Sequence, residues 1–563
     1  MASPFDLVER GLQECRPDTW RRLTAQELSA GFLSAFCSGW RVDLQAGEVS
    51  IAGVDHLLFV IDAAFPNSQP RVYAPGAGSD FRWPHVERFG LLCLRPTSLF
   101  ADVADRIGVH LADALELLTY SAAECQAEFE REFLAYWAQQ AVSASSSPQI
   151  LSLLKPGGEA RTIYQYFDYR AGKCVVADDK TQLKDWLLNC GVNAGDKDIL
   201  PATLLKLSRP LTPAQFPRSG GDLVKDLTDD VLRRSLVPGR RPLFILEAHT
   251  PTGPAFVAVI YKSGAIDALT RGFRNITLVP GDRIRGWFKG RAIERVVVNR
   301  VDGPWIHGRD HSSDFLQLNR RRVAVVGCGA IGSAVANLLA QAGVGELIFV
   351  DGDEIHSANA SRHFLGVDSL RVDKVTGLAR ALARKFPHLK FDYAYPYRFE
   401  RLPVQHLARI ADADLIFAAG LDLEGEAALD AWRASLPCPP AYLSAWAEAY
   451  AMVGHAVLLY GPERLMSQFD VDERPSFRLT DWPDESGAIV VEAGCGNVFQ
   501  PHGAVDLHPI IGMAAGLALD ALLGRVPNSC RRVWMGSRER VEPLGGTLRA
   551  AFDKANIVQE YAW

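Results

Sequence analysis

Apolar runs and amphipathic stretches alternate most regularly in the second half of the chain. Val323–Val326 is a continuous apolar run, which is typical of a strand buried in a parallel sheet. A helical stretch, Ser333–Gln341, follows and ends before Gly343. A second apolar strand, Leu347–Val350, then leads into Asp351. This order of strand, helix and strand predicts a Rossmann-like α/β domain.

The same alternation continues downstream. The helix after Lys374 is predicted to run from Val375 to Phe386, where Pro387 follows. A further buried strand is expected at Asp414–Ala419, and a helix at Gly512–Leu523. The pattern therefore extends the α/β domain towards the end of the chain.

The first part of the chain has a different pattern. Strand-like runs occur at Val49–Ile51 and Leu57–Ile61. A helical stretch, Ser121–Gln140, carries aromatic residues at four-residue spacing on one face. We therefore expect a small α+β domain here.

The middle of the chain begins after a small, polar linker at 141–150. Its strand-like runs are separated by proline and glycine and predict a small α/β or β-rich module without a catalytic constellation. We expect this module to position the two ends. The runs are Cys174–Val176, Leu243–Glu247, Phe256–Tyr261 and Glu294–Val298, and the domains are predicted at residues 1–145, 146–315 and 316–563.

Length and composition limit the class of protein. A chain of 563 residues is too long for one core. Its net charge of −6 gives no basic excess for nucleic acid or an anionic membrane, and we expect no apolar run to span a bilayer. The 10 cysteines include no Cys-x-x-Cys, so we expect reduced thiols, a cytoplasmic location and no structural zinc.

A glycine-rich motif connects the first strand and helix of the α/β domain. Gly327, Gly329 and Gly332 are spaced as Gly-x-Gly-x-x-Gly, and the acid Asp351 ends the next strand. Such a turn lets the backbone approach a phosphate at a helix N-terminus. By itself the motif fits NAD, FAD or ATP.

Polar residues behind the acid narrow the choice. Asp353, Asn359, Arg362 and Lys374 follow within a short stretch, and arginine and lysine are suited to a triphosphate. This pattern resembles the ThiF/MoeB adenylating fold that ubiquitin-activating enzymes share. A later strand ends in Asp422, which matches the family's Mg²⁺-binding acid.

The resemblance implies ATP and Mg²⁺ as cofactors and a role for each residue. The three glycines approach the nucleotide, Asp351 binds the ribose, and Asp353 shapes that edge. Arg362 and Lys374 are also expected to be catalytic, because they neutralise charge as pyrophosphate leaves. The residues implied in phosphate binding are Asn359, Arg362 and Lys374, and the implied Mg²⁺ ligand is Asp422.

The first domain resembles the ubiquitin-conjugating enzymes. The stretch Phe65–Val72 matches their aromatic-Pro-x-x-x-Pro-x-Val strand, and Pro84 stands at the family's interval before Cys93. The resemblance implies that Cys93 carries a thioester. His85 replaces the family's asparagine, and we expect it to donate a hydrogen bond in catalysis in its place.

The adenylating domain is expected to contribute a second thiol. Cys438, Cys495 and Cys530 are the candidates after Asp422. Cys438 lies between prolines and Cys530 lies near the last strand, whereas Cys495 has glycine on both sides. Relatives carry their thioester cysteine in such a loop, so Cys495 is the predicted acyl carrier.

A chain that combines these two domains resembles bacterial fusion proteins in CBASS antiphage operons. They imply adenylation of a protein C-terminal carboxylate, a thioester on Cys495, relay to Cys93 and ligation to a lysine amine. The implied partners are a cGAS/DncV-like nucleotidyltransferase, lysine-bearing acceptors and a second copy in a homodimer. Alternatives are a sulfur-carrier-protein adenylyltransferase, an inactive scaffold and an NAD- or FAD-dependent oxidoreductase.

Overall fold

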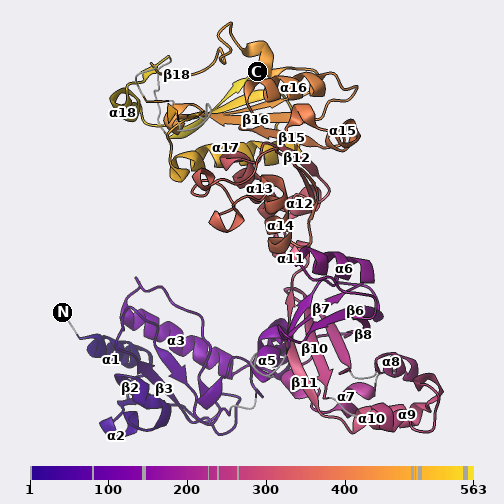
Figure 1. Ribbon diagram of the computed structural model, residues 1–563. Coiled ribbons are helices and arrows are strands. Elements are labelled where there is room, and N and C mark those ends of the chain that lie inside the picture. The colour runs from indigo at the N-terminus through magenta and orange to yellow at the C-terminus, as the bar shows by residue number, and fades with distance from the viewer. Residues whose placement is uncertain are drawn as a thin grey trace. The chain divides into compact units, whose positions relative to one another are not determined.

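A computed structural model of the chain is drawn in Figure 1. The structure describes residues 3–78, 81–141, 148–225, 227–237, 240–262, 266–483, 487–488, 490–491, 498–549 and 556–563. One unit contains residues 1–179 and 197–299, and the other contains residues 180–196 and 300–563.

The first domain is a four-stranded antiparallel sheet in the order β1-β2-β3-β4. Its apolar face packs on α1 and α3, and the predicted strand at Leu57–Ile61 lies within β3. Val49–Ile51 forms no strand, so that prediction was wrong. The bounds are α1 Pro4–Cys15, β1 Trp20–Arg22, α2 Ala25–Leu28, β2 Ser38–Asp43, β3 His56–Ile61, β4 Arg71–Tyr73 and α3 Val103–Leu118.

The predicted aromatic helix is split in two. α4 (Ala122–Arg131) and α5 (Phe133–Gln140) meet at Glu132, and the aromatic face of α5 packs on the central region. Trp137 is fully buried there and donates its indole N–H to the Val296 carbonyl at 3.1 Å. The four-residue spacing thus marks a packing face against the central region.

The central region is a closed barrel in the strand order β10-β11-β5-β7-β6-β8-β9. Side chains that alternate along the strands fill its interior with apolar groups. The sequence predicts only an α/β or β-rich module for this region. It does not predict that the sheet closes into a barrel, because closure depends on pairing between distant strands. The bounds are β5 Gln149–Ser152, β6 Arg161–Asp168, β7 Lys173–Ala177, β8 Ile199–Lys206, α7 Gly220–Val224, α8 Asp229–Arg234, β9 Leu243–Thr250, β10 Gly253–Tyr261, α9 Ile266–Thr270, α10 Gly281–Lys289 and β11 Ile293–Arg300.

The last domain is built on an eight-stranded sheet in the order β14-β13-β12-β15-β16-β17-β21-β23. The pairs from β14 to β16 are parallel, and the pairs from β16 to β23 are antiparallel. The chain order reverses between β12 and β15, which is the point where open α/β sheets bind ligands. The strands are β12 Arg322–Val326, β13 Glu346–Val350, β14 Lys390–Tyr395, β15 Leu415–Ala419, β16 Ala441–Ala447, β17 Val453–Leu459, β21 Cys530–Met535 and β23 Ile557–Ala562.

Helices cover both faces of this sheet. One apolar cluster joins α13, α14 and α17 to the sheet, and a second involves α15 and α16 on the other face (Figure 1). These two layers bury the strands as their continuous apolar runs predict. The bounds are α6 Lys180–Asn189, α11 Gly303–Ile306, α12 Ser313–Leu318, α13 Ala330–Ala342, α14 Lys374–Lys385, α15 Val404–Ala411, α16 Leu423–Ala434, α17 Ala504–Leu522 and α18 Arg538–Val541.

Helix α17 corrects one expectation from the sequence. By length and composition alone, its 19 residues are long and apolar enough to cross a membrane. In the fold, α17 packs against α13 and against β16, β17 and β21. Its apolar character is therefore explained by its place against the sheet.

Candidate active sites

The first candidate site is the thiol of Cys93, which is exposed. The segment before it folds back on β4, because Leu92 donates its backbone N–H to the Val72 carbonyl at 2.8 Å. The Cys93 backbone N–H then donates to the His85 carbonyl, also at 2.8 Å. This turn brings the two residues that the sequence singles out next to each other and leaves the thiol accessible.

His85 connects this turn to α4 and α5. Its backbone has a φ of +57°, and its N–H donates to the Tyr136 hydroxyl at 2.7 Å. Its ring Nε2 lies 3.1 Å from Glu128 Oε2, and Nδ1 lies 3.7 Å from Glu132 Oε2. Both ring nitrogens therefore face carboxylates, and the role of His85 as a hydrogen-bond donor in catalysis stays a prediction.

The Cys93 thiol lies in an acidic environment. Partial burial raises the pKa of Cys93, and the Glu87 and Glu132 carboxylates raise this pKa further. Arg71 opposes them and lowers the pKa. A thiolate is therefore disfavoured in the resting protein, and it requires a higher pH than an ordinary thiol.

Replacing Glu87 tests this electrostatic effect. Glu87→Gln removes a negative charge that raises the Cys93 pKa, so the rate of Cys93 alkylation by iodoacetamide should rise at a lower pH than in the unmodified protein. Peptide mass spectrometry across a pH series measures this rate at Cys93. Glu130→Gln is the matched control, and an unchanged profile for Glu87→Gln would contradict the assignment.

The predicted second thiol, Cys495, lies outside the described residues. Of the alternatives, Cys530 is buried on β21, and burial raises its pKa to about 11. Cys438 is exposed in the turn before β16. The geometry therefore disfavours Cys530 as an acyl carrier, and the role of Cys495 stays a prediction.

The second candidate site is a pocket at the point where the strand order of the last domain reverses. It has a volume of about 220 Å³ and lies at the ends of β12, β13 and β15. The predicted residues that line it are Gly327, Gly329, Asp351, Asp353, Lys374 and Asp422. Strand ends from separate parts of the sequence thus bring together most of the predicted nucleotide site.

The three glycines of the motif have different roles, and two of them, Gly327 and Gly329, line this pocket. Gly327 has a φ of +84°, and a Cβ there would lie 2.0 Å from the Ala419 carbonyl oxygen. A Cβ at Gly332 would lie 1.9 Å from the Gly327 carbonyl oxygen, so this glycine lets α13 pack against the loop. A Cβ at Gly329 would meet nothing within 4 Å. Gly329 therefore leaves open space where a phosphate would approach the N-terminus of α13.

Two alanine variants separate binding from folding. Gly329→Ala should weaken ATP binding while changing the free energy of unfolding by less than about 0.5 kcal/mol, because its Cβ enters only the open space. Gly327→Ala should destabilise the domain by about 1–3 kcal/mol, because it combines backbone strain with a steric clash. Nucleotide titration and thermal unfolding measure the two effects. Equal losses of stability in both variants would refute the distinction.

Asp351 and Lys374 form the charged centre of the pocket. The Asp351 carboxylate accepts the backbone N–H of Cys328 at 2.7 Å and that of Asp353 at 2.8 Å. Lys374 is buried at the start of α14, and its Nζ lies 2.8 Å from Asp353 Oδ2 and 3.9 Å from Asp351 Oδ1. In this structure the carboxylates hold the lysine charge at the edge where phosphates would enter.

Asn359 and Arg362 do not line the same pocket. The Asn359 carboxamide oxygen accepts the His356 backbone N–H at 3.0 Å and stabilises the local turn. Arg362 donates to the Ala358 carbonyl at 3.3 Å. Burial of His502 lowers the pKa of that histidine, and the charge of Arg362 lowers it further. Arg362 thus lies near the segment that precedes α17, and the roles of both residues in phosphate binding stay predictions.

Arg398 is a pocket residue that the sequence analysis missed. It follows β14, lines the pocket and pairs with both Glu400 and Asp422. Asp422 also accepts the Gly425 backbone N–H at 2.9 Å and caps α16. Position after a parallel strand is the signal that could have identified Arg398, since the carboxyl ends of these strands share one edge.

Comparisons with known proteins match the two domains that contain these candidate sites. Residues 36–145 match the model of prokaryotic E2 family B, and residues 309–432 match the model of the ThiF family. The chain joins an E2-like domain to a ThiF domain. The E2-like domain contains Cys93, and the ThiF domain contains the pocket around Lys374.

One relative resembles most of this E2–ThiF fusion. The ATP-dependent ubiquitin transferase-like protein Cap2 of Pseudomonas aeruginosa is 25% identical over 483 residues, which cover 78% of this chain and 80% of that protein. This similarity and the two domain models support an ATP-dependent, ubiquitin-like transferase.

Other relatives resemble only part of the fusion. Ubiquitin-like modifier-activating enzyme 5 of Drosophila willistoni is 37% identical over 79 residues, which cover 14% of this chain and 20% of that enzyme. The crystal structure of E. coli MccB with ATP is 16% identical, with a TM-score of 0.31, and the match covers 40% of this chain and 63% of that one.

Proposed function

We propose that the chain activates the C-terminal carboxylate of a protein with ATP and ligates it to a lysine amine. One observation carries the proposal: the chain that holds an exposed thiol in an E2-like domain also holds a glycine-lined pocket in a ThiF domain. An enzyme that only activates a carboxylate has no use for the first site, and one that only transfers an acyl group has no use for the second.

The reaction divides into four steps. A carboxylate oxygen attacks the α-phosphorus of ATP, and pyrophosphate leaves. The Cys495 thiolate attacks the acyl carbon of the adenylate, and AMP leaves as the thioester forms. The Cys93 thiolate displaces Cys495, and a deprotonated lysine amine then displaces Cys93 to form an amide. Nitrogen loses its proton in the last step, and the thiol is regenerated.

The chemical types of the pocket residues suit the adenylation step. Lys374 supplies a fixed positive charge, and the open space at Gly329 lies next to the free N–H groups of α13. Asp422, whose side chain is half exposed in the pocket, would hold Mg²⁺ together with phosphate oxygens and water. A bound Mg²⁺ would neutralise phosphate charge. In this structure Arg398 supplies a positive charge beside Asp422.

We further propose that the activated protein is a cGAS/DncV-like nucleotidyltransferase in antiphage defence. The support is the similarity to Cap2 across four-fifths of that protein's length together with the two-domain arrangement. A homodimer formed through the ThiF domain is part of the same proposal. The sulfur-carrier and scaffold alternatives lack a use for the exposed Cys93.

Pyrophosphate exchange with a lysine-conjugation assay tests the function. A peptide with the C-terminal sequence of the nucleotidyltransferase should stimulate exchange of labelled pyrophosphate into ATP, and its C-terminal amide should not. Lysine conjugates should then form in the presence of an acceptor protein. Exchange without conjugates would favour the sulfur-carrier alternative, and no exchange with any C-terminal peptide would favour the scaffold.

A further inference from the structure

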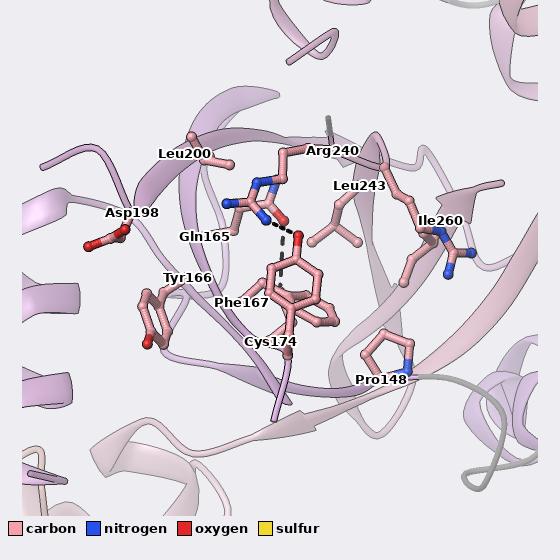
Figure 2. Close-up of a pocket in the computed structure, with 12 residues that line it drawn as sticks. Pro148, Gln165, Tyr166, Phe167, Cys174, Asp198, Leu200, Arg240, Leu243 and Ile260 are labelled. Atoms are coloured by element: carbon pink, nitrogen blue, oxygen red, sulfur yellow. Dashed lines mark hydrogen bonds between the residues drawn. The ribbon is translucent and has the colours of Figure 1, made fainter. Parts of the chain in front are cut away.

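The closed barrel of the central region opens into a pocket of about 480 Å³ (Figure 2). Phe167, Cys174, Leu243 and Ile260 belong both to the apolar cluster inside the barrel and to the lining of this pocket. These side chains therefore form an apolar floor where the filled interior ends. Pockets of this size in the mouths of β-barrels are common sites for small ligands.

Polar groups lie around this floor. Gln165 is only 9% exposed, and its amide donates to the Pro201 carbonyl at 3.1 Å, which fixes the side chain. Arg240 donates to the Tyr169 hydroxyl, and its guanidinium carbon lies 4.9 Å from the centre of the Tyr169 ring. The stacked ring restricts the guanidinium, so Arg240 is held at the pocket before any ligand binds.

The charge of the neighbouring Arg241 is already balanced. Arg241 pairs with Glu294 and donates to the Tyr261 carbonyl at 3.2 Å. Among the described residues, no carboxylate pairs with Arg240, whose hydrogen-bond partner is the neutral Tyr169 phenol. Asp198 also lines the pocket, but its carboxylate points away from the Arg240 guanidinium in Figure 2. Arg240 therefore offers a positive charge that no described carboxylate balances.

We propose that the mouth of the barrel binds an amphipathic carboxylate. A compact apolar or aromatic group would cover the floor of Phe167, Leu243 and Ile260, and the adjacent carboxylate would bind Arg240. A bare phosphate would leave this apolar floor in contact with water. A free organic acid and the C-terminal residue of a peptide share the required chemistry. The proposal does not depend on the proposed function.

Titration of the full-length chain tests this site. By ligand-observed NMR, N-acetyl-phenylalanine should bind saturably, and N-acetyl-phenylalaninamide should bind about tenfold more weakly or less, because it lacks the charge. Inorganic phosphate should not compete with the acid. Equal binding of acid and amide, or no saturable binding of the acid, would overturn the proposal.

Two variants connect the binding to the pocket. Arg240→Gln should weaken binding of the acid about tenfold and leave binding of the amide unchanged. Arg274→Gln, an exposed arginine of the same unit that does not line the pocket, is the matched control. Leu200→Trp fills the pocket from a half-exposed position and should abolish binding of both compounds. Full binding of the acid by a folded Arg240→Gln variant would contradict the assignment of Arg240 as the carboxylate-binding residue.

A peptide arm distinguishes the two sources of the carboxylate. Tighter binding of Gly-Gly-Phe with a free C-terminus than of N-acetyl-phenylalanine supports a peptide C-terminus. Tighter binding of N-acetyl-phenylalanine supports a free acid. If neither compound shows a loss of binding in Arg240→Gln, the carboxylate is not held by this arginine and the proposal fails.

Discussion

Cys93→Ala should reduce the rate of lysine conjugation by about 10³-fold or more, because the variant lacks the sulfur that carries the acyl group. Pyrophosphate exchange should continue at the normal rate, since the nucleotide pocket belongs to the other compact unit. The variant should fold normally, because the Cys93 side chain is exposed. Gel analysis of conjugates and an exchange assay measure the two rates in parallel.

A matched cysteine variant controls for the loss of an exposed thiol. Cys37 is exposed in the same domain, but it lies just before β2 rather than in the turn that contains His85 and Cys93. Cys37→Ala should form conjugates at the normal rate. Normal conjugation by Cys93→Ala would mean that the acyl group reaches lysine without this thiol, and the relay would be abandoned.

Lys374→Met should have the second large effect, on the first chemical step. Methionine keeps much of the apolar stem but removes the charge next to Asp351 and Asp353, so pyrophosphate exchange should fall by about 10²–10³-fold. Thermal unfolding should accompany the assay, because removal of the lysine leaves two carboxylates close together.

Lys385 provides the comparison for this variant. It lies at the opposite end of α14, donates to the Asn337 side chain at 2.9 Å and does not line the pocket. Lys385→Met should therefore exchange pyrophosphate normally. A folded Lys374→Met variant with undiminished exchange would show that the lysine charge plays no part in adenylation.

Local patterns predicted the parts of the fold that local physics determines. The apolar runs at Val323–Val326 and Leu347–Val350 became β12 and β13, and Gly343 ends α13 in the left-handed conformation. The resemblance drawn from the interval between Pro84 and Cys93 singled out a thiol that is exposed, with its backbone hydrogen-bonded to His85. In each case the determining residues are close together in the sequence.

Pairing between distant residues was not predictable in the same way. Closure of the barrel requires β11 to pair with β5, which lies more than a hundred residues earlier in the sequence. The carboxylates of Glu128 and Glu132 approach His85 only because α4 folds back on the turn. Arg398, which follows β14, pairs with Asp422, which follows β15, although β13 and β12 lie between these strands in the sheet. Such partners depend on the packed fold rather than on spacing.

The central claim is that an acyl group activated with ATP passes through the Cys93 thiol. Intact-protein and peptide mass spectrometry should be applied to the chain after incubation with ATP, Mg²⁺ and the C-terminal peptide of the nucleotidyltransferase. The account predicts an adduct of the peptide on Cys93 that requires ATP and is released by a thiol reductant. An adduct on Cys93 that forms equally without ATP, or lysine conjugates that accumulate while Cys93 never carries the peptide, would contradict it.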